Sequence, residues 1–337
     1  MSAQLQAKDF ASSQEVRWCP GCGDYAVLKS VTRALADVGA VPEKTVFVSG
    51  IGCSSRFPYY VETYGFHTIH GRAPAIATGL KLANPDLDVW VVTGDGDGLS
   101  IGGNHLMHAL RRNVGFKILL FNNEIYGLTK GQYSPTSEEG KVTKSTPFGS
   151  VDHPFNPVAL ALGAEATFVA RTVDNDRQHL SEVLRRAAAH RGAAFVEIYQ
   201  NCNVFNDGAF DLLREKPQGV HNQIRLEHGE PVIFDEGTRC VAVGSNGRLQ
   251  IADVADVERE RIVVHDAAGD PSLAFSLANL SSRPTQPTCI GVFRDVERAV
   301  YGEAMLAQIE QTTERLGAGT LEKLLRSGDT WQVPAGA

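Results

Sequence analysis

The sequence predicts an α/β protein built on a doubly wound, mostly parallel sheet, with a smaller α+β extension at its C-terminal end. The main observation is a repeated order of segments: short runs rich in Val, Ile, Leu and Phe, each followed by a polar or glycine turn and a stretch of helical composition. A second observation is that the two clearest runs, 88–93 and 116–121, flank a single helical segment, as in a βαβ crossover. Beyond about residue 211 this alternation stops, which marks the extension.

The expected elements follow in chain order. Residues 1–15 are polar and predict an N-terminal arm, residues 16–215 predict the main domain, and residues 216–337 predict an extension to which the sequence assigns no chemistry. Asp24 can cap the first helix, and Pro74 stands in the first turn of the next. The predicted strands are 45–49, 88–93, 116–121, 166–170 and 194–199, then 239–243 and 261–264 in the extension; the predicted helices are 25–38, 73–84, 102–113, 157–162, 176–191 and 301–316.

Composition excludes several classes of protein. The chain has 337 residues, of which 43% are hydrophobic, enough for one large domain plus an extension. Its formal net charge of -7 argues against a nucleic-acid partner, which needs a basic face. No apolar run has membrane-spanning length, and residues 1–10 lack the apolar core of a signal peptide, so we expect no membrane partner and a cytoplasmic location. The six cysteines are then expected to be reduced thiols or metal ligands.

Gly94-Asp95-Gly96-Asp97-Gly98 follows one predicted strand, and Asn122-Asn123 ends the next. Because crossovers are right-handed, the carboxyl ends of both strands open onto one edge of the sheet, and Asp95 and Asn123 should be neighbours. Their oxygens suit a Mg²⁺ ion that also holds phosphates, and the glycines leave backbone N–H groups free for a diphosphate. The alternative is a nucleotide-binding turn, but Leu99 replaces the third glycine of that fingerprint, and Asn122 stands where it has an acid.

This arrangement resembles the thiamine diphosphate motif of thiamine-dependent enzymes. The resemblance implies that Asp95 and Asn123 bind Mg²⁺ through their side chains and Ile125 through its carbonyl. A polar stretch downstream, 134–147, is too long for a simple connector and predicts a lid or a partner-contacting loop.

Four cysteines, Cys19, Cys22, Cys53 and Cys202, lie in tight turns or beside predicted strand ends. Four thiolates can hold either Zn²⁺ or a [4Fe–4S] cluster, so the ligand count alone does not choose. A zinc staple has no evident task beside a thiamine site, whereas an electron acceptor has one, which favours the cluster. The other two cysteines, in the extension, are expected to be buried apolar residues.

Five motifs in order resemble the β subunit of the 2-oxoacid:ferredoxin oxidoreductases, most closely the 2-oxoglutarate (succinyl-CoA-forming) branch. The resemblance covers about residues 15–215 and rests on Trp18-Cys19-Pro20-Gly21-Cys22-Gly23, Gly50-Ile51-Gly52-Cys53-Ser54, His70-Gly71-Arg72-Ala73, Gly94-Asp95-Gly96-Asp97 and Asn122-Asn123. It implies the fold of the thiamine diphosphate-binding domains. It also implies that the four cysteines above hold a [4Fe–4S] cluster.

The resemblance further implies the reaction and the partners. Such enzymes decarboxylate a 2-oxoacid, transfer the acyl group to coenzyme A and reduce ferredoxin. In that family the glutamate that activates the thiamine comes from an α subunit, so this chain is expected to be inactive alone and to assemble as α2β2. The residues expected to contact the cofactor are Ser49, Gly50, Cys53, Ser54, His70, Gly94, Asp95, Gly96, Asp97, Asn123, Ile125, Gly127, Leu128 and Thr129.

Substrate choice rests on two cations. A dicarboxylate such as 2-oxoglutarate needs a positive charge at its far end, and Arg56 and Lys130 lie in the predicted strand-end segments. The family positions that they match are associated with substrate recognition. The alternative is that either side chain contacts the cofactor phosphates or the α subunit.

Three rival functions remain open at this point. The same enzyme can act on pyruvate or another 2-oxoacid. A non-redox thiamine decarboxylase would contain no iron. A scaffold subunit with a zinc staple and a degenerate thiamine fold would contain zinc without iron or sulfide.

Overall fold

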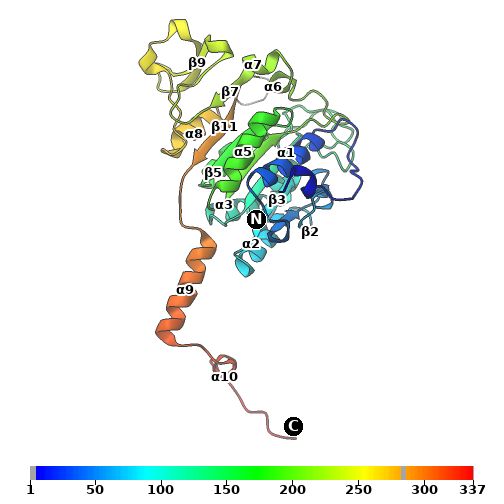
Figure 1. The fold of residues 1–337 in the computed structure, drawn as a ribbon, viewed down its shortest axis with the longest axis vertical. Helices are drawn as coiled ribbons and strands as arrows, with labels where there is room; N and C mark the ends of the chain where they lie inside the picture. The colour runs from blue at the N-terminus through cyan, green and yellow to red at the C-terminus, as the bar shows by residue number, and fades with distance from the viewer. Residues whose placement is uncertain (1–4, 282–285, 337) are drawn as a thin grey trace.

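The computed structural model describes residues 5–281 and 286–336, and its core is one eight-stranded sheet (Figure 1). The strand order is β2-β1-β3-β4-β6-β5-β11-β7. Strands β1 to β6 are parallel, β11 is antiparallel to β5, and β7 is parallel to β11. The strands are β1 (Thr45–Ser49), β2 (Tyr64–His67), β3 (Asp88–Gly94), β4 (Lys117–Asn122), β5 (Phe168–Val173), β6 (Ala194–Tyr199), β7 (Gln223–Leu226) and β11 (Thr288–Asp295). The predicted doubly wound α/β class is confirmed.

Helices cover both faces of this sheet, because successive side chains of each buried strand point to opposite sides. In β3, Val89 and Val91 join the apolar core under one set of helices, and Trp90 and Val92 join the core under the other. The first set is α2 (Ala73–Ala83), α3 (Gly103–Arg111), α4 (Pro157–Gly163) and α8 (Pro271–Ala278). The second is α1 (Asp24–Asp37) and α5 (Arg177–Ala189), which pack against each other (Figure 1).

Two predicted elements differ from the structure. The run 166–170 begins its strand later, at Phe168. The run 261–264 forms only isolated bridges, Ile262 with Ala242 and Val264 with Pro231, beside a small antiparallel sheet of β8 (Ile233–Phe234), β9 (Arg239–Val243) and β10 (Leu249–Asp253). Residues beyond 215 also supply β7 and β11 to the main sheet. The main sheet therefore contains strands from both sides of the predicted boundary at residue 215.

The two ends of the chain behave differently. Residues 1–4 of the predicted arm lie outside the described residues, but the arm's Phe10 is fully buried, and Ala11 pairs with Val61. At the other end, α9 (Tyr301–Leu316) and α10 (Leu321–Leu325) project from the body and bury none of their side chains (Figure 1). In the middle of the chain, two short helices, α6 (Asp211–Arg214) and α7 (Gln218–Asn222), follow β6.

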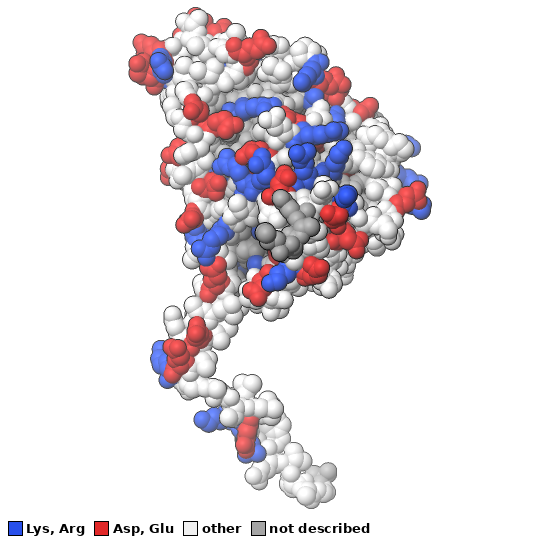
Figure 2. Space-filling model, in the orientation of Figure 1, with Lys and Arg blue, Asp and Glu red and all other residues white. Residues whose placement is uncertain are grey.

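Short helical turns connect several of these elements. They are η1 (Ala7–Phe10), η2 (Pro42–Lys44), η3 (Ser54–Tyr59), η5 (Asp235–Gly237), η6 (Val254–Asp256), η7 (Arg259–Arg261) and one turn of π-helix, η4 (Asp97–Ile101). Among the described helices, none is long and apolar enough to cross a membrane. Figure 2 shows acidic side chains interspersed with the basic ones on the face in view.

Candidate active site

The carboxyl ends of β1, β3 and β4 surround a cavity of about 750 Å³. The turn after β3 forms one wall, because Gly94 ends the strand and the π turn η4 begins at Asp97. The opposite wall is the segment after β4. Twelve of the predicted cofactor contacts line this cavity: Cys53, Ser54, His70, Gly94, Asp95, Gly96, Asp97, Asn123, Ile125, Gly127, Leu128 and Thr129.

Asp95 is a buried carboxyl group on the cavity wall, only 3% exposed. The hydroxyl of Thr136 donates to its Oδ2 at 2.8 Å. Burial raises the pKa of Asp95 to about 6, and hydrogen bonds from Ser134 and Thr136 oppose that shift. No Lys, Arg or His of the described residues forms an ion pair with it. A buried carboxylate without a cation fits the chemistry of a metal ligand.

The segment after β4 presents oxygen atoms to the same cavity. Asn123 lines the cavity, and its amide donates to the Gln200 side chain at 2.8 Å. Glu124 has a φ of 55°, which turns the chain so that Ile125 also faces the cavity. Within the described residues, no donor is hydrogen-bonded to the Ile125 carbonyl. Asp95, Asn123 and this carbonyl therefore fit the predicted Mg²⁺ ligand set.

Gly96, on the cavity wall, allows a close approach between the turn after β3 and Tyr126. A Cβ at this position would lie 2.1 Å from the ring of Tyr126, whose hydroxyl donates to the Gly96 carbonyl at 3.1 Å. Only glycine allows the ring and the turn to approach this closely. Tyr126 and this turn therefore form one continuous part of the cavity wall.

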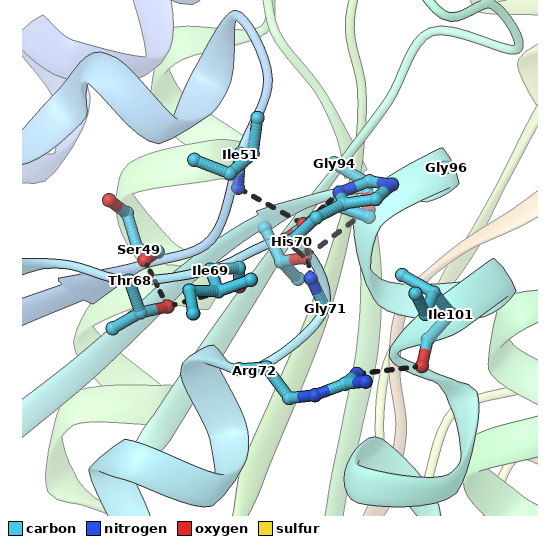
Figure 3. Close-up of polar contacts among 12 residues, drawn as sticks. Ser49, Ile51, Thr68, Ile69, His70, Gly71, Arg72, Gly94, Gly96 and Ile101 are labelled. Atoms are coloured by element: carbon cyan, nitrogen blue, oxygen red, sulfur yellow. Dashed lines mark hydrogen bonds and ion pairs between the residues drawn. The ribbon is translucent and has the colours of Figure 1, made fainter.

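Asp97 also lines the cavity, but its carboxylate is hydrogen-bonded to the loops after β1 and β2. Its Oδ1 accepts hydrogen bonds from the backbone N–H groups of Ile51 at 3.0 Å and Gly71 at 2.7 Å, and it lies 2.7 Å from His70 Nδ1. Figure 3 shows these three groups converging on one point beside Gly94 and Gly96. Asp97 therefore joins three strand-end segments.

The four predicted cluster cysteines lie in one neighbourhood. The sulfurs of Cys53 and Cys202 are 3.4 and 3.7 Å from the point where a Cβ of Gly127 would stand. Burial raises the pKa of the Cys53 thiol to about 12, and the negative charges of Asp24, Cys202 and Cys19 add to that shift. Burial also raises the pKa of Cys22, whose sulfur accepts from the Gln200 amide at 3.2 Å.

These four thiols lie near one another, but they do not surround a common metal position. Among the residues that the structure describes, no group of three or more His, Cys, Asp or Glu side chains is already arranged around a metal position. The raised pKa values of Cys22 and Cys53 have a physical consequence: these two thiols stay protonated until a positive centre stabilises their thiolates. The donor set suits iron or zinc equally.

The remaining predicted residues lie outside the cavity. Ser49 is fully buried; its hydroxyl donates to the Ser55 carbonyl at 2.8 Å and lies 2.9 Å from His67 Nδ1. Gly50 makes room for the Asp97 carboxylate. Arg56 donates to the Arg17 carbonyl at 3.0 Å, and Lys130 is exposed with a φ of 77°. Neither cation lines the cavity of this chain alone.

Sequence reasoning missed several residues of the site. Thr136 comes from the loop predicted as a lid, but nothing in its composition singles out one hydroxyl. The Thr136 oxygen also lies 2.9 Å from Asn122 Oδ1, and the Asn122 amide donates to Glu197 at 2.7 Å. The other unpredicted lining residues are Ile51, Gly52, Phe121, Tyr126, Gln132, Tyr133, Ser145 and Thr146. Of these, Ser145 and Thr146 belong to the same predicted lid.

A buried ion pair contacts the end of β4 next to the cavity. Arg171 Nε lies 2.6 Å from Glu197 Oε2, and both side chains are almost fully buried. Because Glu197 also accepts from Asn122, the pair fixes the end of β4 on which Asn123 stands. Removal of either the Arg171 or the Glu197 side chain would leave the other charge buried without an ion-pair partner.

Comparison with known proteins agrees with this geometry. Residues 50–198 match the family described as "Thiamine pyrophosphate enzyme, C-terminal TPP binding domain". The fold, the cavity beside Asp95 and this match therefore identify a thiamine diphosphate-binding domain in the chain.

Relatives narrow the assignment. The chain is 60% identical over 331 residues to 2-oxoglutarate oxidoreductase subunit KorB of Mycobacterium tuberculosis, covering 97% of this chain and 88% of the relative. It is 36% identical over 250 residues to 2-oxoglutarate synthase subunit KorB of Methanocaldococcus jannaschii, covering 73% and 89%. A solved 2-oxoglutarate:ferredoxin oxidoreductase from Magnetococcus marinus, with 2-oxoglutarate, coenzyme A and succinyl-CoA bound, aligns over 97% of both chains with a TM-score of 0.75 and 33% identity.

The chain belongs to the β subunits of the 2-oxoglutarate:ferredoxin oxidoreductases. The predicted family and thiamine diphosphate domain are confirmed.

Proposed function

We propose that this β subunit holds thiamine diphosphate through Mg²⁺, carries a [4Fe–4S] cluster beside it, and works with an α subunit to convert 2-oxoglutarate and coenzyme A to succinyl-CoA and CO₂ while reducing ferredoxin. One observation carries the proposal. The cavity beside Asp95 and the sulfurs of Cys53 and Cys202 meet at Gly127, which lines the cavity and also adjoins both sulfurs.

For the cofactor, the donors divide into two groups. Asp95, Asn123 and the Ile125 carbonyl would bind Mg²⁺, because they combine a buried carboxylate with neutral oxygens on one wall. Gly94 and Gly96 would leave backbone N–H groups to the diphosphate, with positive potential from the helix that follows. Thr136 orients Asp95 through its hydroxyl hydrogen bond. Leu128, Thr129 and Ser54 would contact the remainder of the cofactor from the cavity wall.

For the cluster, Cys19, Cys22, Cys53 and Cys202 would be the ligands. Gln200 donates to the Cys22 sulfur, and this kind of hydrogen bond stabilises a thiolate ligand. When bound, thiamine diphosphate supplies the carbanion chemistry of decarboxylation and the cluster supplies a one-electron acceptor. The chain's own contribution is to hold the two sites together at Gly127 and to exclude water from the buried wall around Asp95.

Partners follow from what the site lacks. In the cavity of this chain, the described lining residues include no glutamate that could activate the thiamine. An α subunit would supply that group at an interface, in an α2β2 assembly, and the chain alone would be inactive. Cys19 is exposed, so ferredoxin would approach the cluster from its side. Arg56 and Lys130 would hold the far carboxylate of the substrate once the interface forms.

Metal analysis tests the proposal directly. The chain is co-expressed with its α subunit, purified without oxygen, and assayed for iron, acid-labile sulfide and zinc. Equal amounts of iron and sulfide, together with 2-oxoglutarate-dependent reduction of ferredoxin, are expected. Zinc without iron or sulfide would support the scaffold alternative instead, and a colourless, active decarboxylase would support a non-redox enzyme.

A further inference from the structure

Gln200 is a buried residue that contacts both candidate sites. It follows β6 and is only 1% exposed. Its Oε1 accepts from the Asn123 amide at 2.8 Å. Its Nε2 donates to the Asn201 carbonyl at 2.6 Å and to the Cys22 sulfur at 3.2 Å. One side-chain amide is therefore hydrogen-bonded to a residue of the proposed magnesium site and to a residue of the proposed cluster site.

Hydrogen bonds fix which way this amide faces. The Asn201 carbonyl can only accept, so the Gln200 atom beside it is the nitrogen, and the Gln200 oxygen faces Asn123. Asn123 must then present its own NH₂ group to Gln200. The Ile125 backbone N–H, 3.3 Å from Asn123 Oδ1, requires the same orientation because it can only donate. The Asn123 oxygen is therefore turned away from Gln200, and this oxygen is the atom that the proposed metal role needs.

The main chain fixes the distance between the end of β6 and the first cysteine pair. The Gly23 N–H donates to the Asn201 carbonyl at 3.1 Å, one residue after Cys22. A Cβ on Gly23 would lie 1.9 Å from Asp174 Oδ2, so only glycine allows the cysteine turn to approach this closely. Cys22 should therefore stay in place when the Gln200 amide is removed.

We propose that Gln200 is a positioning residue shared by the two sites: it turns the Asn123 oxygen toward the Mg²⁺ position, and its N–H donates to the Cys22 thiolate when that sulfur binds the cluster. A hydrogen bond to a ligand sulfur withdraws negative charge from a cluster and so favours its reduced state. The cluster should then accept an electron more readily than one without this donor. The inference rests on the proposed function and adds to it one residue that serves both the cofactor and the electron acceptor.

Gln200→Met removes both hydrogen bonds and keeps a flexible side chain of similar length. In the co-expressed complex we expect about a tenfold loss of Mg²⁺ affinity in the presence of thiamine diphosphate, because the Asn123 amide is free to turn. We also expect the equilibrium for reduction of the cluster to fall about tenfold, which for a one-electron couple is a shift of about 59 mV to more negative potential.

Gln200→Glu separates the two roles. A glutamate oxygen still accepts from the Asn123 amide, but no N–H remains for the Cys22 sulfur. We expect a Mg²⁺ affinity within about threefold of the parent, and a cluster potential at least as negative as that of Gln200→Met. Equal losses of Mg²⁺ affinity in the two variants would overturn the role toward Asn123. An unchanged potential in both would overturn the role toward Cys22.

Gln223→Met is the matched control. The Gln223 amide donates to the Leu213 carbonyl at 2.6 Å and lies in β7, the strand at the far edge of the sheet from β2. This variant should change neither the Mg²⁺ affinity nor the cluster potential. Changes as large as those of Gln200→Met would mean that loss of any such hydrogen bond loosens both sites.

The cluster potential is measured by redox titration of the complex, followed by electron paramagnetic resonance. Mg²⁺ affinity is measured by titration of cofactor-free complex at saturating thiamine diphosphate, followed by protein fluorescence, and thermal unfolding identifies any variant that has lost its fold. A parent complex without iron and sulfide, or one that binds no thiamine diphosphate, would overturn the proposed function together with this inference. A parent that contains the cluster and binds the cofactor, with Gln200→Met unchanged in affinity and potential, would overturn this inference alone.

Discussion

The indole N–H of Trp18 donates to the carbonyl of Cys53 at 2.7 Å, which ties the segment before Cys19 and Cys22 to the loop after β1. Trp18 is buried, and its ring packs edge-on against Tyr25 and Tyr60 at 5.6 and 4.8 Å. The bond thus sets the distance between the first cysteine pair and the third cysteine.

Trp18→Phe should loosen this connection. The change leaves the Cys53 carbonyl without its donor and a gap beside the smaller ring, which together cost about 1–3 kcal/mol. We expect the complex to lose iron to a chelator faster than the parent complex does. Absorbance measures the rate of this loss. Trp331→Phe is the matched control, because Trp331 is 83% exposed and lies far along the C-terminal segment. Equal rates in the two variants would show that the indole bond is irrelevant to the cluster.

Replacing cysteines one at a time should separate ligands from core residues. Serine at Cys19, Cys22, Cys53 or Cys202 should lower the iron and sulfide content of the complex, because a hydroxyl is a poor ligand for iron in these clusters. Alanine at Cys240 or Cys289, both buried in the extension and its strand, should leave the iron content unchanged. Iron and sulfide assays on anaerobically purified complexes check this. Retention of full iron content in Cys202→Ser would remove that residue from the ligand set.

Gly96→Ala should abolish cofactor binding by a steric route. The new Cβ would lie 2.1 Å from the Tyr126 ring, so the ring or the turn must move. We expect at least a hundredfold loss of thiamine diphosphate affinity, about 3 kcal/mol. Gly103→Ala is the control, because nothing lies within 4 Å of its Cβ position in α3 and alanine favours a helix. Titration of both variant complexes with thiamine diphosphate makes the comparison.

Much of this site was predictable, and the limits are physical. The strands 45–49 and 194–199 match their predicted bounds because their buried apolar runs end at clear turns. The proximity of Asp95 and Asn123 on one cavity follows from the handedness of a βαβ crossover alone. Strand β2 was missed because all four of its residues are exposed, so its sequence carries no alternating pattern.

The direction in which each side chain points was the second feature that the sequence could not predict. Asp95 and Asp97 are two residues apart in the same motif, yet one carboxylate receives Thr136 from a distant loop and the other receives Ile51 and Gly71. Sequence spacing does not distinguish them, because the loops that contact each carboxylate come from different strand ends. The helix predicted at 102–113 also begins after a π turn, which re-aims Asp97.

Acid should destabilise the chain partly through His179. Burial, with a contribution from Arg225, lowers the pKa of His179 to about 4, and its Nδ1 lies 2.8 Å from the Thr172 hydroxyl. The unfolded chain then binds a proton that the folded chain does not, between the ordinary histidine pKa of about 6.5 and about 4. Stability therefore falls as the pH falls through this window.

Urea unfolding of the full chain tests that effect. Relative to His179→Gln, the wild-type chain should lose about 2 kcal/mol more stability between about pH 7.5 and about pH 5. His190→Gln is the matched comparison, a second histidine-to-glutamine change, at a side chain that lies 3.0 Å from the Asp295 carboxylate. Parallel pH profiles for the wild type and His179→Gln would contradict the assignment.

Substrate choice should depend on the charge of Arg56 and Lys130. Lys130 follows the cavity residues Leu128 and Thr129, and Arg56 follows Cys53 and Ser54, so each lies next to the cavity without lining it in the isolated subunit. If the α subunit closes this side, their charges would meet the far carboxylate of 2-oxoglutarate. Lys130→Met or Arg56→Met should then raise KM for 2-oxoglutarate by about tenfold, about 1.4 kcal/mol, and change KM for pyruvate or 2-oxobutyrate by less than about twofold. The assay is ferredoxin reduction by the co-expressed complex with each substrate. Equal losses for all three acids would place the two cations at the cofactor or the subunit interface.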